Sequence, residues 1–298
     1  MSLPFALPPI IEGGATPVWV MDGFQIGSEF TKVLQYSLND SGWNDDLTLF
    51  HEESAGDQHF IDQASRLHAL GELKKHVKQP NPTILEVGCS SGFMLEEMQK
   101  AFPDATIIGS DVVNSPLKKL AEKIPHVPLL RFDMVHCPLP DNSIDAIVML
   151  NVLEHIEDDA GALAQAMRVL KPGGTLIIEV PAGPHLYDAY DKILMHYRRY
   201  RLSSFCKLLE NAGFQILKRS HLGVFLYPGF WLVKQMNKRR LSESEAISRQ
   251  KVDTAIRKTG SNKLMNAIMQ LELRLGRFLS YPTGIRCLVS CVKADKKT

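Results

Sequence analysis

Short apolar runs alternate with stretches of helical periodicity along most of the chain. Each apolar run is bounded by turn residues, which predicts a buried strand of a mostly parallel sheet. The runs cover residues 84–87, 105–110, 127–132, 144–150, 175–180, 214–220 and 284–292. Apolar residues at helical spacing occupy 29–38, 58–77, 202–212, 262–279 and the stretch after Phe93. Strands that alternate with helices predict an α/β fold of the doubly wound, Rossmann-like kind.

The predicted elements divide the chain into a core and additions at both ends. Residues 1–80 are expected to form an N-terminal arm and helical cover, 81–221 the Rossmann-like core, and 284–298 its final strand. An insertion, 222–283, begins with the apolar and aromatic run LGVFLYPGFWLVKQM and a basic cluster at 238–240. We interpret this insertion as a substrate lid, a dimer surface or a patch on a membrane surface, and packing on the core is favoured over membrane contact.

One strand-turn-helix unit, residues 83–100, carries the first chemical signal. The turn at 88–92, GCSSG, has little side-chain bulk, so a ligand can reach the backbone N–H groups at the start of the next helix. Asp111 ends the next strand about twenty residues later, where a carboxylate can accept hydrogen bonds from both ribose hydroxyls of an adenosine. Phe93 stands in place of the third glycine of the dinucleotide fingerprint, which argues against a bound pyrophosphate.

Three segments of the chain resemble the class I S-adenosylmethionine-dependent methyltransferases of the bacterial small-molecule type. Their first motif, E/D-x-G-x-G-x-G, is matched, with serine in place of the middle glycine, at Glu86, Gly88, Ser90 and Gly92. Residues 152–155, VLEH, and 170–174, LKPGG, resemble two later motifs, and the likeness extends over about residues 51–221 and the last strand. It implies a seven-stranded sheet in the order 3-2-1-4-5-7-6 and S-adenosylmethionine as cofactor.

The resemblance also implies which residues bind the cofactor. They are Glu86, Gly88, Cys89, Ser90, Gly92, Asp111, Val112, Asp133, Met134 and Asn151. Asp133 is expected to bond the exocyclic amine of adenine, and Met134 to pack on the ring. Residues 51–66 resemble a segment that closes over the cofactor, with matches at His59, Phe60 and Arg66. An amphipathic helix with His59 at its surface is an equally good interpretation.

Two histidines are candidates for catalysis. His155 follows the fourth core strand on the ligand side of the sheet, and His196 lies after the fifth, so either could act as a general base. Asn151, Glu154 and His155 are spaced to share a helical face and resemble the E-x-x-E-H metal motif of some methyltransferases. Asparagine in place of the first glutamate removes a charged ligand, and we predict no metal.

The segment after the fifth strand is where this fold commonly places the acceptor. The candidate acceptor-binding residues there are Tyr187, Tyr190, Arg198, Arg199 and Tyr200, within a D…H-x-R-R-Y segment that resembles a bacterial subgroup of the family. Two arginines suit a carboxylate, phosphate or other anionic acceptor. Solvated charges that precede a helix are the alternative interpretation, and the sequence does not choose between the two.

The composition of the chain bears on its binding partners and its cellular location. A net charge of +1 over 298 residues gives no global attraction to nucleic acid or anionic membranes, and no nucleic-acid partner is expected. Five scattered cysteines do not form a disulfide framework, which favours a reduced, cytoplasmic location. The apolar N-terminus lacks a basic region and is broken by prolines, so we do not expect a signal peptide.

The sequence therefore predicts a methyltransferase that uses S-adenosylmethionine and acts on a small-molecule or lipid-like acceptor, with oxygen favoured over nitrogen or carbon. Peripheral membrane contact through 222–240 and a homodimer are left open. One rival is a catalytically silent methyltransferase-like partner subunit. The other, an NAD-dependent oxidoreductase, is disfavoured by the missing glycine and by the LKPGG segment.

Overall fold

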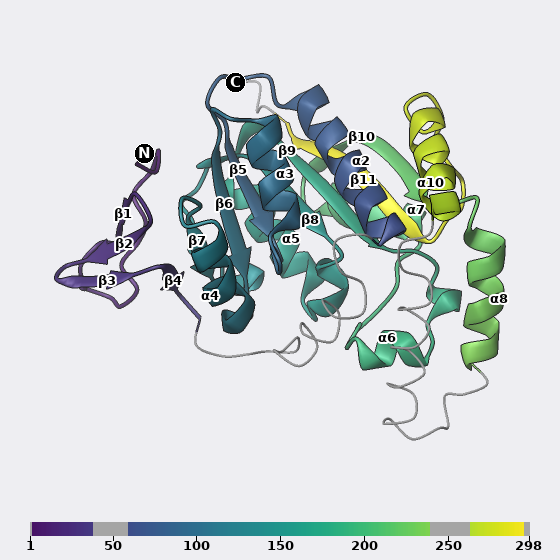
Figure 1. The fold of residues 1–298 in the computed structure, drawn as a ribbon, viewed down its shortest axis with the longest axis horizontal. Coiled ribbons are helices and arrows are strands. Elements are labelled where there is room, and N and C mark those ends of the chain that lie inside the picture. Colours follow the sequence, from purple (N-terminus) through teal and green to yellow (C-terminus); the bar gives the residue numbers. More distant parts are fainter. Residues whose placement is uncertain (1, 38–58, 239–262, 295–298) are drawn as a thin grey trace.

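The computed structural model describes residues 2–37, 59–238 and 263–294. An eight-stranded sheet with helices on both faces forms its centre, in the order β10-β11-β9-β8-β5-β6-β7-β4 (Figure 1). In that order the strands are Phe214–Leu222, Arg286–Lys293, Leu170–Pro181, Ile144–Leu150, Thr83–Val87, Thr106–Asp111, Leu129–Arg131 and Val33–Gln35. β11 is antiparallel to both of its neighbours, and the other pairings are parallel. The strands predicted from the apolar runs are all present, and their predicted order is confirmed.

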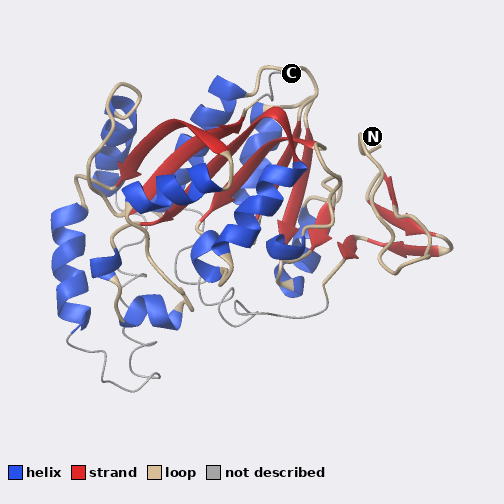
Figure 2. Ribbon diagram, turned by 180° about the vertical axis from the view of Figure 1, so that it is seen from behind, coloured by secondary structure: helices blue, strands red, loops and turns tan. Residues whose placement is uncertain are grey.

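Helices cover both faces of the sheet (Figure 2), and an apolar core lies between the sheet and the helices on each face. On one face, α2 (Phe60–His76), α3 (Phe93–Ala101) and α4 (Asn114–Lys123) bury residues such as Leu73 and Leu95. On the other face, α5 (Asp159–Val169) and α7 (Leu202–Asn211) bury residues such as Leu163 and Phe205. Both faces of the central strands are therefore covered, which explains why those strands read as continuous apolar runs.

The helix predicted at 29–38 was wrong. Residues of this stretch form β3 (Glu29–Thr31) and β4, and β3 joins β1 (Val18–Val20) and β2 (Gly23–Ile26) in a small antiparallel sheet. Leu34 is fully buried and pairs in parallel with Leu130 of β7. A strand here satisfies the backbone groups along the open edge of β7, and this long-range pairing overrides the weak local helical pattern. The arm thus adds the eighth strand.

The insertion before the last strand contributes α8 (Tyr227–Lys238) and α10 (Lys263–Leu275). α10 packs against α2, and its buried Glu272 carboxylate accepts a hydrogen bond from the backbone N–H of Gly223 at 2.6 Å. α8 lies at the periphery of the molecule in both views, where it contacts α6 (Ala189–Ile193) (Figures 1 and 2). None of the helices in the described residues is long and apolar enough to span a membrane. Arg239 and Arg240 of the basic cluster lie outside the described residues.

Candidate active site

The small-residue turn follows β5 and leads directly into α3. Gly88 and Gly92 have φ angles of 75° and 78°, and Ser90 also lies in the left-handed region with a φ of 39°. A Cβ atom at Gly88 or at Gly92 would overlap a neighbouring side chain. The glycines are therefore required both by the backbone conformation and by the lack of space. The backbone of this turn, residues 88–92, is therefore not covered by its own side chains and lines a cavity that is described below.

Asp111 connects this turn to the end of β6. One of its carboxylate oxygens accepts a hydrogen bond from the backbone N–H of Ser90 at 2.9 Å, and the other accepts from the backbone N–H of Val113 at 3.0 Å. The carboxylate is 8 % exposed, so its orientation is fixed while it still borders the cavity. A carboxylate oxygen can accept more than one hydrogen bond.

Glu86 is a buried carboxylate on β5 beside the same turn. Its Oε2 atom is buried and has no hydrogen-bond partner within the described residues. Burial, reinforced by the neighbouring charge of Asp111, raises the pKa of Glu86 well above its ordinary value. A buried acceptor without a partner is costly, so this atom marks a place where a cationic or hydrogen-bonding ligand group would be stabilised.

One cavity of about 1240 Å³ runs through this region. Every residue predicted to bind the cofactor lines it, including Asp133 and Met134 at the start of the short helix η1 (Met134–His136). Asp133 accepts a hydrogen bond from the backbone N–H of Val135 at 3.0 Å. The volume exceeds the range of about 300–1,000 Å³ that is usual for a single small ligand, so the cavity has room for a donor and an acceptor together.

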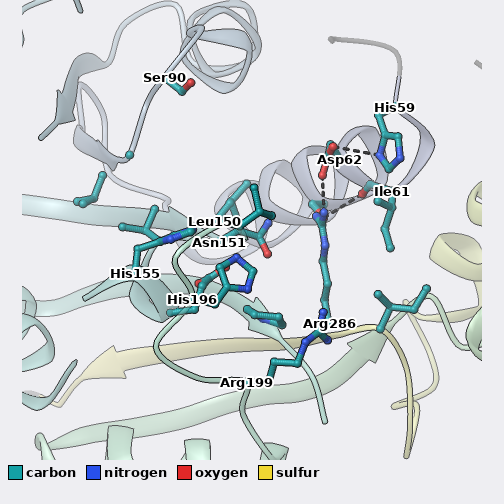
Figure 3. A pocket seen from close by; sticks show the side chains of 18 of the residues that line it. His59, Ile61, Asp62, Ser90, Leu150, Asn151, His155, His196, Arg199 and Arg286 are labelled. Atoms are coloured by element: carbon teal, nitrogen blue, oxygen red, sulfur yellow. Dashed lines mark hydrogen bonds and ion pairs between the residues drawn. The ribbon is translucent and has the colours of Figure 1, made fainter. Parts of the chain in front are cut away.

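His155 and His196 lie side by side in the cavity wall, with ring centroids 4.6 Å apart (Figure 3). Glu154 joins them, and the potential ligand atoms of the three residues lie within 4.8 Å of one another, so this group could hold a metal ion. Glu154 is 1 % exposed, and burial raises its pKa to about 8. Asn151, which the sequence placed in the metal motif, instead donates a hydrogen bond to Glu179 at 3.0 Å.

A buried carboxylate, Asp191, positions His196. Its Oδ1 atom lies 2.8 Å from Nδ1 of His196 and accepts a hydrogen bond from Nε of Arg199 at 2.7 Å. Burial alone would raise the pKa of Asp191, but the hydrogen bond from His196 and the charges of Lys234 and Arg199 hold it well below its usual range. An ionised carboxylate only accepts hydrogen bonds, so Nδ1 of His196 carries the proton and Nε2 is the free acceptor.

Lys234 of α8 completes this network from the insertion. Its ammonium donates to Asp188 at 2.7 Å and to Asp191 at 2.9 Å, and all three side chains are almost fully buried. Burial lowers the pKa of His196 and leaves its ring neutral near neutral pH. The arrangement therefore presents a neutral, oriented imidazole with an ionised partner, which is the arrangement required of a general base.

The predicted acceptor-binding residues divide into two groups. Tyr190 and Arg199 line the cavity, whereas Tyr187, Arg198 and Tyr200 do not. The Tyr187 hydroxyl donates to the carbonyl of His196 at 2.7 Å, and the Tyr200 hydroxyl donates to the Asp159 carboxylate at 2.9 Å. Arg198 forms an ion pair with the same Asp159 carboxylate at 2.7 Å. Both arginines are therefore paired with carboxylates of the chain, which weakens the expectation of an anionic acceptor.

The first residues of α2 form another part of the wall. His59, Phe60 and Arg66 line the cavity, as a segment that covers the cofactor requires, and residues 51–58 lie outside the described part of the chain. Asp62 of the same helix pairs with His59 at 3.1 Å and with Arg286 of β11 (Figure 3). Arg286 also donates to Glu179 at 2.8 Å. Sequence reasoning missed this network because its members are far apart in the chain.

Sequence reasoning also missed the apolar wall of the cavity. It is built by side chains of the insertion, namely Phe225, Leu226, Phe230, Val233, Met236 and Met265. The aromatic run at 222–236 was the available signal, but its spacing did not show which side chains would face inward. The wall is linked to the histidine pair, because Lys234 of α8 also bonds Asp191.

Comparison with known proteins agrees with this geometry. Residues 85–178 match the family model described as a methyltransferase domain. The "probable S-adenosylmethionine-dependent methyltransferase" of Mycolicibacterium smegmatis is 31 % identical over 144 residues, which are 48 % of this chain and 54 % of that protein. The sterol 24-C-methyltransferase of Aspergillus fumigatus is 29 % identical over 193 residues, 58 % of this chain and 47 % of that protein.

The fold is also shared with solved structures. An S-adenosylmethionine-dependent methyltransferase from Mesorhizobium loti superposes with a TM-score of 0.52 at 16 % identity, over 78 % of this chain and 99 % of that chain. The chain spans about half the length of the curated relatives named here, 54 % and 47 %. The family match over residues 85–178 and the sheet order show that this part of the chain is similar to the methyltransferase domains of S-adenosylmethionine-dependent enzymes.

Proposed function

We propose that the protein transfers a methyl group from S-adenosylmethionine to an acceptor that is largely apolar, at oxygen in preference to nitrogen or carbon. The observation that carries the proposal is the single cavity that joins the glycine turn to the apolar wall of the insertion, with the Asp191–His196 pair between them. When bound, the cofactor supplies an electrophilic methyl group on a sulfonium. The residues of the chain bind and orient the cofactor and the acceptor, and one of them deprotonates the acceptor.

The cofactor end of the cavity fits this assignment. Asp111 would accept hydrogen bonds from the ribose hydroxyls, because backbone N–H groups already fix its carboxylate at the cavity wall. Asp133 and Met134 would hold the adenine at the neighbouring strand end. The orphaned oxygen of Glu86 would gain a partner in the ammonium of the methionine part, and pairing would lower its raised pKa.

His196 is the proposed general base. Its Nε2 atom would take the proton from an acceptor hydroxyl while the oxygen forms its bond to the methyl carbon and the bond from that carbon to sulfur breaks. Asp191 keeps Nδ1 protonated and stabilises the imidazolium that forms, as in other histidine–carboxylate pairs. Such base catalysis typically contributes about 10²–10⁴-fold to the rate. His155, beside His196, would form part of the cavity wall around the reacting atoms.

The acceptor class is inferred from the wall and from the charges. Aliphatic and aromatic side chains of α8 and α10 line the acceptor side, and Arg199 is already paired with Asp191. An apolar acceptor gains free energy in proportion to the area it buries against such a wall, whereas the arginines that line the cavity in the described part of the chain are already paired with carboxylates. The sterol methyltransferase among the relatives acts, by its name, on a lipid at carbon, so the preference for oxygen rests on the poised base alone.

A methyl-transfer assay tests the proposal. The protein is incubated with S-adenosylmethionine labelled in its methyl group and with either a lipid extract or a water-soluble extract, and the label is followed into each fraction. We expect label in the lipid fraction. Replacement of His196 by asparagine should lower the rate by about 10²-fold or more. His126→Asn, at an exposed histidine, is the matched control.

The outcomes separate the candidate functions. Mass spectrometry of the labelled product decides between oxygen, nitrogen and carbon. Label in the water-soluble fraction alone would refute the apolar acceptor. Calorimetric binding of S-adenosylhomocysteine without transfer to either extract would favour the silent partner subunit, and binding of NAD in its place would overturn the methyltransferase assignment.

A further inference from the structure

The helix α8 is inverted with respect to an ordinary surface helix. One of its two lysines, Lys234, is 3 % exposed and donates hydrogen bonds to the buried Asp188 and Asp191. Apolar residues of the same helix are exposed instead: Trp231 by 44 %, Leu232 by 56 %, Val233 by 52 % and Met236 by 51 %. A soluble helix normally places its charges outward and its apolar stripe toward the core. This outward apolar face therefore needs a cover.

The exposed face is continuous with the mouth of the cavity. Val233 and Met236 are half exposed and at the same time line the cavity, as does Phe225 just before α8, which is 48 % exposed. Tyr197 also lines the cavity and is 49 % exposed. A protein partner seated permanently on this face would close the mouth. A lipid surface would cover the same face and still deliver an apolar acceptor into the cavity.

Charges of both signs lie near the cavity: Glu157 and Asp158 are exposed acidic residues that line it, whereas α8 itself carries lysines. The sequence of α8, YPGFWLVKQMNK, contains no acidic residue, so nothing in this helix repels an anionic headgroup. α6, which contacts α8, carries the exposed Lys192. Trp231 combines an apolar ring with an N–H donor, and such side chains favour the boundary between headgroups and acyl chains. None of the described helices can span a bilayer, so the contact would be peripheral.

We propose that the outward face of α8, formed by Trp231, Leu232, Val233 and Met236, together with Phe225 just before the helix, binds the surface of a phospholipid bilayer and that the acceptor enters the cavity from there. The helix would lie in the interface with its apolar side chains among the upper acyl segments. This proposal rests on the proposed function in one respect, because it takes the acceptor to be lipid-like.

Vesicle flotation of the full-length protein tests the proposal. Vesicles of phosphatidylcholine alone, and of phosphatidylcholine mixed with phosphatidylglycerol, are compared at low and high salt. We expect binding to both, stronger with the anionic lipid at low salt. Leu232→Glu should lower the partition coefficient by about tenfold or more, because an inserted leucine is replaced by a charge. Leu67→Glu, at a leucine of α2 that is 43 % exposed, is the matched control.

A second measurement keeps the test independent of the proposed function. S-adenosylhomocysteine binding by calorimetry should be equal in wild type and Leu232→Glu, which shows that the variant is folded. Flotation of Leu232→Glu like wild type, or no flotation of wild type, would overturn the membrane proposal and leave the methyltransferase proposal standing. Normal flotation without binding of S-adenosylhomocysteine would overturn the methyltransferase proposal and leave the membrane proposal standing. A wild-type dimer that Leu232→Glu converts to a monomer, without flotation, would assign the face to a second copy of the chain.

Discussion

Replacement of Lys234 by methionine should destabilise the protein strongly and in a pH-dependent way. The ammonium donates hydrogen bonds of 2.7 Å and 2.9 Å to Asp188 and Asp191, and the Lys234 side chain, like both carboxylates, is almost fully buried. Removal of one partner from a buried pair typically costs about 3–5 kcal/mol of unfolding free energy. At about 2 °C per kcal/mol for a chain of this size, the melting temperature should fall by about 6–10 °C.

The sign of the pH dependence follows from which carboxylate loses its counter-charge. Asp191 keeps Arg199 and His196, but within the described residues Asp188 keeps only backbone N–H partners. Burial already raises the pKa of Asp188, and loss of Lys234 should raise it further. The folded variant then binds more protons than the unfolded chain above the ordinary aspartate pKa of about 3.9, so its stability falls as pH rises. The deficit should be larger at pH 8 than at pH 5.

Thermal unfolding followed by circular dichroism at these two pH values is the assay. Lys171→Met is the matched control, because Lys171 also bonds a carboxylate at 2.8 Å but is 39 % exposed, and its loss should cost less than about 1 kcal/mol. The double variant Lys234→Met with Asp188→Asn should recover part of the loss at pH 8. If Lys234→Met melted like the control at both pH values, the buried ammonium would not compensate the two carboxylates and the reasoning would be refuted.

Three further predictions concern the site itself. Asp111→Asn should weaken S-adenosylhomocysteine binding by about tenfold or more in calorimetry, since hydrogen bonds to a charged group are worth about 1.5–3 kcal/mol, whereas Asp104→Asn at an exposed position should not. The pH profile of kcat/KM should rise through an apparent pKa below the ordinary 6.5 of histidine, because burial lowers the pKa of His196, and Asp191→Asn should depress the plateau. Chelation by EDTA should leave activity at pH 7 unchanged, since the pKa of Glu154 of about 8 keeps its group neutral; metal-dependent recovery after dialysis would contradict this.

The cofactor end could be predicted from the sequence because its signals are local. The glycine turn, its strand and its helix are contiguous, and Asp111 follows at a spacing set by one helix and one strand. The error at 29–38 has the opposite origin. β4 has only three residues, and it is a strand because Leu34 pairs with Leu130, about a hundred positions away, a contact that no local pattern encodes.

The acceptor end could not be predicted because it is assembled from distant residues. Arg286 meets Glu179 across 107 positions and Asp62 across 224. The H-x-R-R-Y segment named His196 and Arg199, but spacing alone could not show that Arg199 would be neutralised by Asp191, five residues before His196. Side-chain type gave the candidates, and only the fold decided which of them face the cavity and which hold the segment in shape.

In the helix α8 of the insertion, the sequence pattern and the fold lead to opposite interpretations. A single lysine within an apolar run looks, in the sequence, like the solvated residue of an otherwise buried helix. The structure reverses this: Lys234 is buried against Asp191, and Leu232 and its apolar neighbours face outward. One side of α8 therefore fixes the carboxylate that orients the proposed base, and the other side contributes the rim through which an apolar acceptor would pass. Any change that detaches α8 would disturb both, whereas substitutions confined to one side should disturb one alone, because residues without shared partners act independently.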